Sequence, residues 1–305
     1  MNESHKTIVH KPVLMSEVLQ YLNLQKGGIY LDVTFGSGGH SRAILTHAPD
    51  SRVVSLDWDS DVLDTFTPAL TAEFGDRFIP VWANFGNMLP ALKKIGITEF
   101  DGILADFGTS QVQIFTKAGF SVYNDMPLDM RMSPGHQRLT AAQVVNTFDE
   151  KTLREMFYQL GEEKHSKKIA QMIIQHRALA PLETTKQLAQ LIERCVPWGR
   201  SGGKIHPATR VFQALRMFVN QELDNIYSFL SVAPKLLKPD GRLVCISFHS
   251  LEDRLVKQTF RDMDQSGLVQ LVTKKVVIAS PDEVRRNPSS RSAKLRAVQK
   301  NAHIE

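Results

Sequence analysis

Short runs of apolar and β-branched residues alternate with amphipathic segments through the first third of the chain. Apolar runs of this length, bounded by turn residues, are typical of buried strands. Between them, apolar residues spaced three and four apart are typical of helices that cover a sheet. The pattern predicts an α/β fold with strands at residues 29–33, 52–56, 78–82 and 100–105. A helix is also expected from Ser16, a fair N-cap, to Leu22.

This alternation stops at about residue 111. From there to residue 207 the periodicity is helical and no strand-like run occurs, which predicts an inserted helical domain. Its helices are expected at residues 141–148, 152–160, 166–178 and 185–195. The charged run at 162–168 fits either a phosphate contact or a solvated helix face. Residues 197–203 are expected to form a mobile loop.

After the insertion, Pro207 is well placed to begin one long helix. Its apolar stripe consists of Val211, Leu215, Phe218, Ile226 and Phe229. A fifth strand is predicted at 242–247, and residues 268–278 can add a hairpin-like edge. The predicted domains are therefore the first part of the sheet domain (1–110), the helical insertion (111–207), and the second part of the sheet domain with a basic C-terminal tail (208–305).

The composition is that of a globular protein. Hydrophobic residues make up 42% of the 305 residues, which is enough for a sizeable core. No apolar run approaches the roughly 18 residues that a membrane span needs, and the N-terminus lacks the apolar core of a signal peptide. Cys195 and Cys245 are the only cysteines, which argues against a disulfide framework or a thiolate metal cage. We therefore expect a cytoplasmic protein.

The net charge of +5 is concentrated near the C-terminus. Residues 274–305 contain eight Lys or Arg against three Asp or Glu, so the remainder of the chain sums to zero. A basic segment on a neutral body favours a polyanion partner, because positive charge attracts phosphates and releases their counterions. A merely solvated tail is the alternative. On the first reading, its basic residues contact phosphates rather than read bases.

A glycine-rich loop follows the first predicted strand. Gly36, Gly38 and Gly39 separate that strand from a helix, and a turn without Cβ atoms allows a ligand close to the backbone. A dinucleotide fingerprint needs a third glycine or alanine where Ser41 stands, and a second mononucleotide half is missing. S-adenosylmethionine, which has no pyrophosphate, is therefore favoured over a dinucleotide. A glycine turn without any ligand is the structural alternative.

Side chains suited to a nucleotide follow the other strands. Asp57 lies about 20 residues past the glycine loop, where a carboxylate can accept both ribose hydroxyls, although Asp57 or Asp59 could instead cap a helix. Phe85 follows the third strand and Asp106 ends the fourth. Because ligands of open α/β sheets bind beyond the carboxyl ends of the strands, these placements favour a cofactor site.

Longer motifs carry a family resemblance. They are TFGSGGHS (34–41), PLDMRM (127–132), HPATRVFQALR (206–216), SFHSLED (247–253) and RSAKLR (291–296). Together, in order along nearly the whole chain, they resemble the RsmH (MraW) family. The resemblance implies an α/β, class I (Rossmann-like) S-adenosylmethionine-dependent methyltransferase with an inserted all-helical substrate-recognition domain. It also implies methyl transfer to the exocyclic amine of a cytidine in the decoding region of 16S ribosomal RNA, within the small ribosomal subunit.

The resemblance also assigns site residues. The implied cofactor-binding residues are Gly36, Gly38, Gly39, His40, Asp57, Phe85, Asp106 and Gln113. Asp106 is the expected proton acceptor, with Asp129 as a second candidate, and neither a metal ion nor a covalent intermediate is required. The expected RNA-binding residues are Arg285, Arg286, Arg291, Lys294 and Arg296. His249 fits either a buried structural histidine or an RNA contact.

Two other functions remain open at this point. One is an RNA-binding protein whose cofactor site is inactive, although the intact glycine loop and Asp57 argue against decay. The other is a nicotinamide-dependent oxidoreductase, against which Ser41 and the missing second half of a dinucleotide fold both speak.

Overall fold

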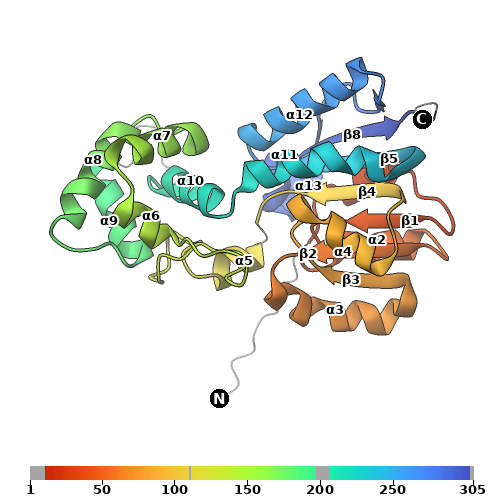
Figure 1. Ribbon diagram of the computed structural model, residues 1–305, viewed down its shortest axis with the longest axis horizontal. Helices are drawn as coiled ribbons and strands as arrows, with labels where there is room; N and C mark the ends of the chain where they lie inside the picture. The colour runs from red at the N-terminus through yellow and green to blue at the C-terminus, as the bar shows by residue number, and fades with distance from the viewer. Residues whose placement is uncertain (1–10, 110, 197–205, 303–305) are drawn as a thin grey trace. The chain divides into compact units, whose positions relative to one another are not determined.

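The computed structural model describes residues 11–109, 111–196 and 206–302 (Figure 1). The chain divides into two compact units, one formed by residues 1–110 and 223–305 and the other by residues 111–222. In their described parts, the first unit contains the sheet and the second is helical. The loop predicted at 197–203 lies outside the described residues.

The first unit is built on one mixed sheet. Its strands are β1 (Ile29–Asp32), β2 (Arg52–Asp57), β3 (Phe78–Trp82), β4 (Phe100–Asp106), β5 (Leu237–Ser247), β6 (Val269–Leu271), β7 (Val277–Ile278) and β8 (Lys294–Lys300). Their order is β3-β2-β1-β4-β5-β8-β6, and β7 also pairs with β8. The first five strands of this order are parallel, and β8 is antiparallel to β5. The predicted α/β class is confirmed.

Helices cover both faces of this sheet (Figure 1). One hydrophobic cluster joins the sheet to α1 (Met15–Leu22), α2 (Gly39–His47) and α3 (Ser60–Phe74). The other joins it to α4 (Leu89–Ile95), α11 (Glu222–Val232) and α12 (Ser250–Gln265). Neighbouring strand residues such as Tyr30 and Leu31 belong to opposite clusters, because side chains alternate along a strand. Two buried faces explain why the strands read as nearly continuous apolar runs.

The first helix begins differently from the prediction. Leu14, rather than Ser16, is the N-cap of α1, and it has a left-handed backbone with φ 50°. Its N–H donates to the carboxylate of Glu283 at 2.7 Å, in the short helix α13 (Pro281–Arg286). A hydrogen bond to a distant carboxylate, which no local pattern reveals, therefore holds this conformation in place.

The second unit contains the four helices predicted for the insertion, which are α6 (Ala141–Thr147), α7 (Glu150–Gly161), α8 (Ser166–Arg177) and α9 (Thr185–Cys195). It also contains α5 (Gln111–Thr116), which was not predicted, and α10 (Thr209–Val219). Capping boxes begin α6 and α9, where Thr140 pairs with Gln143 and Thr184 pairs with Gln187. Among the helices described in either unit, none is long and apolar enough to cross a membrane.

The second boundary of the insertion lies later than expected. We predicted residue 207, whereas the helical unit extends to residue 222. The reason is that α10 packs against α7 of the same unit. A Cβ atom added to Gly161 would lie only 2.5 Å from the carbonyl oxygen of Arg210, so the two helices approach with glycine at their contact.

The prediction of one long helix after Pro207 was wrong, because the structure has two helices there, α10 and α11. Between α10 and α11, Gln221 takes a left-handed conformation with φ 50°. Asn220 fixes this break: its side-chain amide donates to the Met130 carbonyl at 2.7 Å and its oxygen accepts from the Met132 N–H at 2.8 Å. The apolar spacing continues across the break, so periodicity alone did not reveal it.

The C-terminal segment is not a tail. Residues Lys294–Lys300 form β8, which pairs with β5 on one side and with β6 and β7 on the other. Leu295, Ala297 and Val298 are fully buried. Lys294 and Arg296 alternate with Leu295 and Ala297, because successive side chains of a strand point to opposite faces of the sheet. The predicted hairpin edge is also wrong, because β6 and β7 each pair with β8 rather than with each other.

Candidate functional site

The candidate site lies where the strand order reverses. β1 pairs with β2 on one side and with β4 on the other, so the chain leaves β1 and β4 in different directions. In open α/β sheets such a switch point opens a crevice beyond the carboxyl ends of the strands. β1 ends at Asp32, β2 at Asp57 and β4 at Asp106, all at this edge.

The glycine loop is shaped by positions that a side chain could not occupy. Gly36 and Gly38 have φ of 54° and 78°, and Gly38 is the N-cap of α2. A Cβ atom on Gly38 would lie 2.7 Å from the Phe35 ring, and one on Gly39 would lie 2.7 Å from Pro12. Gly36 and Gly38 therefore make the turn, whereas the missing side chain of Gly39 allows Pro12 to pack against the start of α2.

Asp57 fastens the loop to the end of β2. One carboxylate oxygen accepts from the Gly36 N–H at 3.0 Å and the other accepts from the Asp59 N–H at 3.0 Å. The sequence left open whether Asp57 or Asp59 caps a helix. Asp59 is the residue that does so, because its side chain accepts from the Asp61 N–H at the start of α3. Burial raises the pKa of Asp57 from 3.8 to about 6, against the opposing effect of these two hydrogen bonds. Each oxygen still has a lone pair for a ribose hydroxyl.

Behind the loop lies a polar network that the sequence did not reveal. Asp32 is fully buried, and the hydroxyl of Ser41 donates to it at 2.6 Å. Because that hydroxyl has one hydrogen, the contact of 2.8 Å between Ser41 and Ser55 requires Ser55 to donate. Burial raises the pKa of Asp32, and the Ser41 hydrogen bond opposes the rise. Ser41 occupies the position where a dinucleotide fingerprint would have glycine or alanine. Its hydroxyl links α2 to Asp32 of β1 and to Ser55 of β2.

His40 and Asp106 face each other beside the loop. The Nε2 atom of His40 lies 3.5 Å from a carboxylate oxygen of Asp106, and the two side chains are 7% and 14% exposed. Both ring nitrogens of His40 and Oδ1 of Asp106 are buried without a hydrogen-bond partner among the described residues. The backbone N–H of Asp106 donates to the Thr34 hydroxyl at 2.7 Å, which ties the end of β4 to the loop.

Phe85 belongs to an aromatic cluster. Its half-buried ring lies 5.8 Å from the ring of Phe107 and 5.9 Å from that of Phe229. Asn84 precedes it and donates to the side chain of Asn225 at 3.2 Å. The cluster fixes the orientation of the ring at the end of β3, and a contact with adenine remains a prediction.

Two further predicted residues belong to the second unit. Gln113 is buried on α5. Asp129 forms a two-pronged ion pair with Arg131, at 2.7 and 2.8 Å. Burial alone would raise the pKa of Asp129, but the hydrogen bonds from Arg131 outweigh it and hold that pKa below the usual value. Such a carboxylate is a weak base, so the geometry does not support Asp129 as the proton acceptor. Arg131 is thereby committed to Asp129 as its partner.

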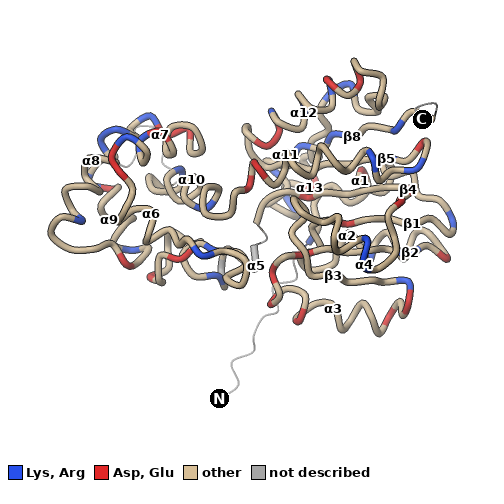
Figure 2. The backbone as a smooth tube through the Cα atoms, in the orientation of Figure 1, with Lys and Arg blue, Asp and Glu red and all other residues tan. Residues whose placement is uncertain are grey.

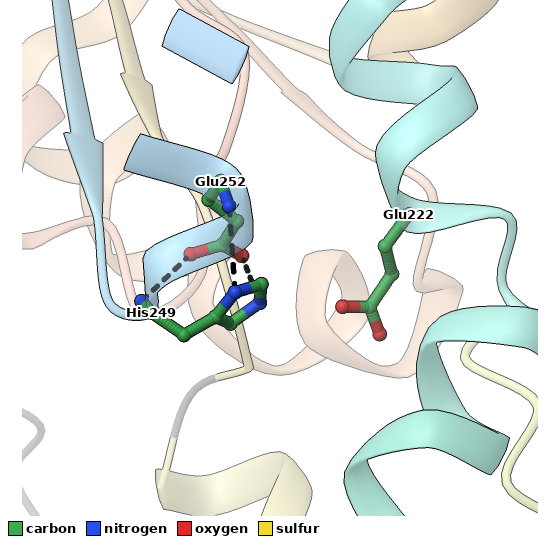
Figure 3. Close-up of side chains that lie close together, drawn as sticks. All are labelled: Glu222, His249 and Glu252. Atoms are coloured by element: carbon green, nitrogen blue, oxygen red, sulfur yellow. Dashed lines mark hydrogen bonds and ion pairs between the residues drawn. The ribbon is translucent and has the colours of Figure 1, made fainter. Parts of the chain in front are cut away.

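His249 begins α12 as its N-cap (Figure 3). The Glu252 N–H donates to its ring and the Glu252 carboxylate accepts from the His249 N–H, which makes a capping box. The structural interpretation of His249 is therefore supported over an RNA contact. Figure 3 also draws Glu222 of the second unit, whose carboxylate pairs with Arg216 of α10 at 2.8 Å.

The predicted RNA-binding residues do not form one group. Arg296 of β8 pairs with Asp253 at 2.7 Å and is only 12% exposed, so its role is structural. Arg285, Arg286 and Arg291 are exposed, although Arg285 also pairs with Asp282 within α13. Lys and Arg are spread over both units rather than confined to the C-terminal segment (Figure 2).

Together, the fold and the site define an S-adenosylmethionine-dependent methyltransferase. Residues 7–301 match the model of the MraW methylase family. The chain therefore belongs to the MraW methylase family.

Relatives of similar length accompany this match. "Ribosomal RNA small subunit methyltransferase H" of Crocosphaera subtropica is 46% identical over 304 residues, which cover 98% of this chain and 91% of that protein. The protein of the same name from Cyanothece sp. PCC 7425 is 48% identical and covers 100% and 99%. That from Carboxydothermus hydrogenoformans is 44% identical and covers 95% and 97%.

The residues present fit the cofactor. Apart from its chain neighbours, Gly36 has no atom closer than 4.0 Å to where its Cβ would lie, Asp57 offers carboxylate lone pairs for ribose hydroxyls, and buried polar atoms of His40 and Asp106 lack partners among the described residues. The bound cofactor supplies an activated methyl group at this edge of the sheet. The protein itself must bind and orient the acceptor, exclude water, and remove one proton.

Proposed function

We propose that this enzyme methylates the exocyclic amine of a cytidine in 16S ribosomal RNA, in the decoding region of the small ribosomal subunit. Three relatives named ribosomal RNA small subunit methyltransferase H, each at least 44% identical over nearly the whole chain, support a ribosomal RNA substrate. A cytoplasmic location follows from this substrate.

The carboxylate of Asp106 is the observation that carries the proposal. It lies at the carboxyl end of β4, next to the glycine loop, and Oδ1 has no partner among the described residues although it is buried. The exocyclic nitrogen of cytosine is a poor nucleophile because its lone pair is delocalised into the ring. A carboxylate that accepts from this amine localises the lone pair and takes the proton that becomes acidic during transfer.

RNA contacts are assigned by exposure and charge. In the proposal, Arg285, Arg286 and Arg291 contact phosphates, because their guanidinium groups lie at the surface of the first unit. The helical unit serves substrate recognition. The target base must be splayed out of its stack to reach the end of β4. Family membership and the intact loop do not favour an inactive site or an oxidoreductase.

The test uses the purified enzyme with assembled small subunits from cells that lack it, and with deproteinised 16S RNA. We expect N4-methylcytidine at one position, measured by mass spectrometry of the digested RNA. Methylation of a different base or of a ring atom would refute the proposed reaction. Asp106→Ala is expected to lose turnover even at saturating cofactor, and full turnover would remove Asp106 from the mechanism.

A further inference from the structure

The side chain of His40 has no structural task that the structure shows. His40 lies in the first turn of α2 and is 6% exposed, yet neither ring nitrogen has a hydrogen-bond partner among the described residues. Burying an unpaired polar group is costly, so native structures rarely keep one without a reason. Its Nε2 atom lies 3.5 Å from Asp106, within reach of a hydrogen bond that tightens when a substrate is bound.

Acidic groups face His40 from two strands. Asp106 approaches from the end of β4, and the fully buried Asp32 interacts with His40 electrostatically from the end of β1. Asp57, at the end of β2, interacts with Asp32 in turn. A histidine that took up a proton here would become a cation beside the Asp106 carboxylate, which is a paired rather than an isolated buried charge.

We propose that His40 is a positioning residue for Asp106 and receives the proton that Asp106 accepts from the substrate amine. This inference rests on the proposed function. The lone pair of the amine nitrogen forms a bond to the methyl carbon while the bond from that carbon to sulfur breaks, with its electron pair left on sulfur. The N–H proton passes to the Asp106 carboxylate and then to Nε2 of His40, which restores the carboxylate and releases the proton to solvent.

The chemistry of the two groups explains why such a pair is useful. An ordinary aspartic acid has a pKa of about 3.9 and an ordinary imidazole about 6.5, so a proton at neutral pH is held more readily by imidazole. Among the described residues, His40 is the only histidine whose ring forms an ion-pair contact with Asp106, at 3.5 Å. The rings of His206 and His249 contact Glu193 and Glu252 instead. The position of His40 is thus the one from which an imidazole could take the proton from Asp106.

Two variants separate this role from a packing role. His40→Gln keeps a polar side chain of similar reach but cannot take up the proton, and the backbone N–H of residue 40 remains. His47→Gln is the matched control, because His47 is exposed at the other end of α2 and contacts the Ala43 carbonyl of its own helix at 2.8 Å. Cofactor affinity is measured by calorimetry in both variants, and turnover is then compared at saturating cofactor, because His40 is itself a predicted cofactor-binding residue.

The first measurement is kcat between pH 5.5 and 8.5, with small subunits and saturating cofactor so that titration of Asp57 does not enter. We expect the wild type and His47→Gln to gain activity with rising pH and reach a plateau. His40→Gln is expected to be at least tenfold slower on the plateau and to lose the pH dependence. A slower variant that keeps the wild-type pH dependence would overturn the proposal, as would a variant that simply fails to bind the cofactor.

The second measurement needs no RNA. The ring resonances of ¹³C-labelled histidine are titrated in the cofactor-free protein, and the His40 signal is assigned by its absence in His40→Gln. Asp106→Asn is expected to move the midpoint of that signal to lower pH by at least half a unit, and an unmoved midpoint would overturn the proposal. If the wild type methylates no ribosomal RNA, the proposed function fails while this titration still decides the role of His40.

Discussion

Asp57 is expected to weaken the fold while it serves the cofactor. Burial raises its pKa from 3.8 to about 6. Because a tenfold change in an acid constant corresponds to about 1.4 kcal/mol, the ionised carboxylate costs roughly 3 kcal/mol of folding stability at neutral pH. In Asp57→Asn this cost disappears. Asparagine has one acceptor oxygen for the N–H groups of Gly36 and Asp59, so one hydrogen bond worth about 1–3 kcal/mol is lost.

These two effects nearly cancel. We expect the free energy of unfolding of Asp57→Asn to lie within about 2 kcal/mol of the wild-type value at pH 8. Cofactor affinity is expected to fall at least tenfold, because ribose hydroxyls lose a charged acceptor worth about 1.5–3 kcal/mol. Calorimetry measures the affinity. Urea unfolding, followed by the fluorescence of Trp58 and Trp82 in a Trp198→Phe background, measures the stability of the first unit.

The pH dependence gives the sharper test. The folded-state pKa of Asp57 lies above its unfolded value, so its stabilising contribution is complete below about pH 3.8 and is lost as pH rises through about 6. Between pH 8 and pH 5 the wild type should therefore gain about 1.4 kcal/mol relative to Asp57→Asn. The exposed Asp64→Asn on α3 is the control and should follow the wild type. Parallel stabilities of wild type and Asp57→Asn over this range would refute the reasoning.

Three further changes have distinct signatures. Gly38→Ala, which forces a side chain into a left-handed turn and against a ring, should lower the unfolding free energy by about 1–3 kcal/mol and abolish cofactor binding; thermal unfolding and calorimetry check both. Ser41→Ala removes the donor to buried Asp32 and should cost about 1.5–3 kcal/mol in urea unfolding, and a loss under 0.5 kcal/mol would contradict this. Replacing both Arg285 and Arg286 with Gln should reduce the log–log salt slope of RNA binding by about 1.4, or about 0.7 for each phosphate contact, while stability is unchanged, and an equal slope would exclude phosphate contacts.

Much of the first unit could be predicted from its sequence. β3 was predicted at its observed residues and β2 differs by the inclusion of Asp57, because short apolar runs between turn residues have few other stable arrangements. The glycine loop was recognisable because positive φ at Gly36 and Gly38 excludes most other residues. Local constraints of this kind act within a few positions and therefore leave a mark on the sequence.

The candidate site was only partly predictable. The position of Asp57 in the sequence indicated a ribose contact, but its two bonds to Gly36 and Asp59 depend on the folded loop. The Ser41–Asp32 hydrogen bond and the approach of His40 to Asp106 join residues from different strands and helices. Motif spacing indicates which residue types are present and cannot show which atoms lack a partner.

The sequence by itself determined the fold class, the alternation of strands and helices through β4, and the nature of the ligand loop, since these depend on periodicity and local backbone preference. Only the tertiary structure decided that Lys294–Lys300 is a strand inside the sheet, that Asn220 breaks the long helix, and that Arg296 is bound to Asp253. Each of these depends on a partner more than 40 residues away. Such contacts depend on the packing and hydrogen bonding of the whole chain, and a pattern within a few neighbouring residues does not contain that information.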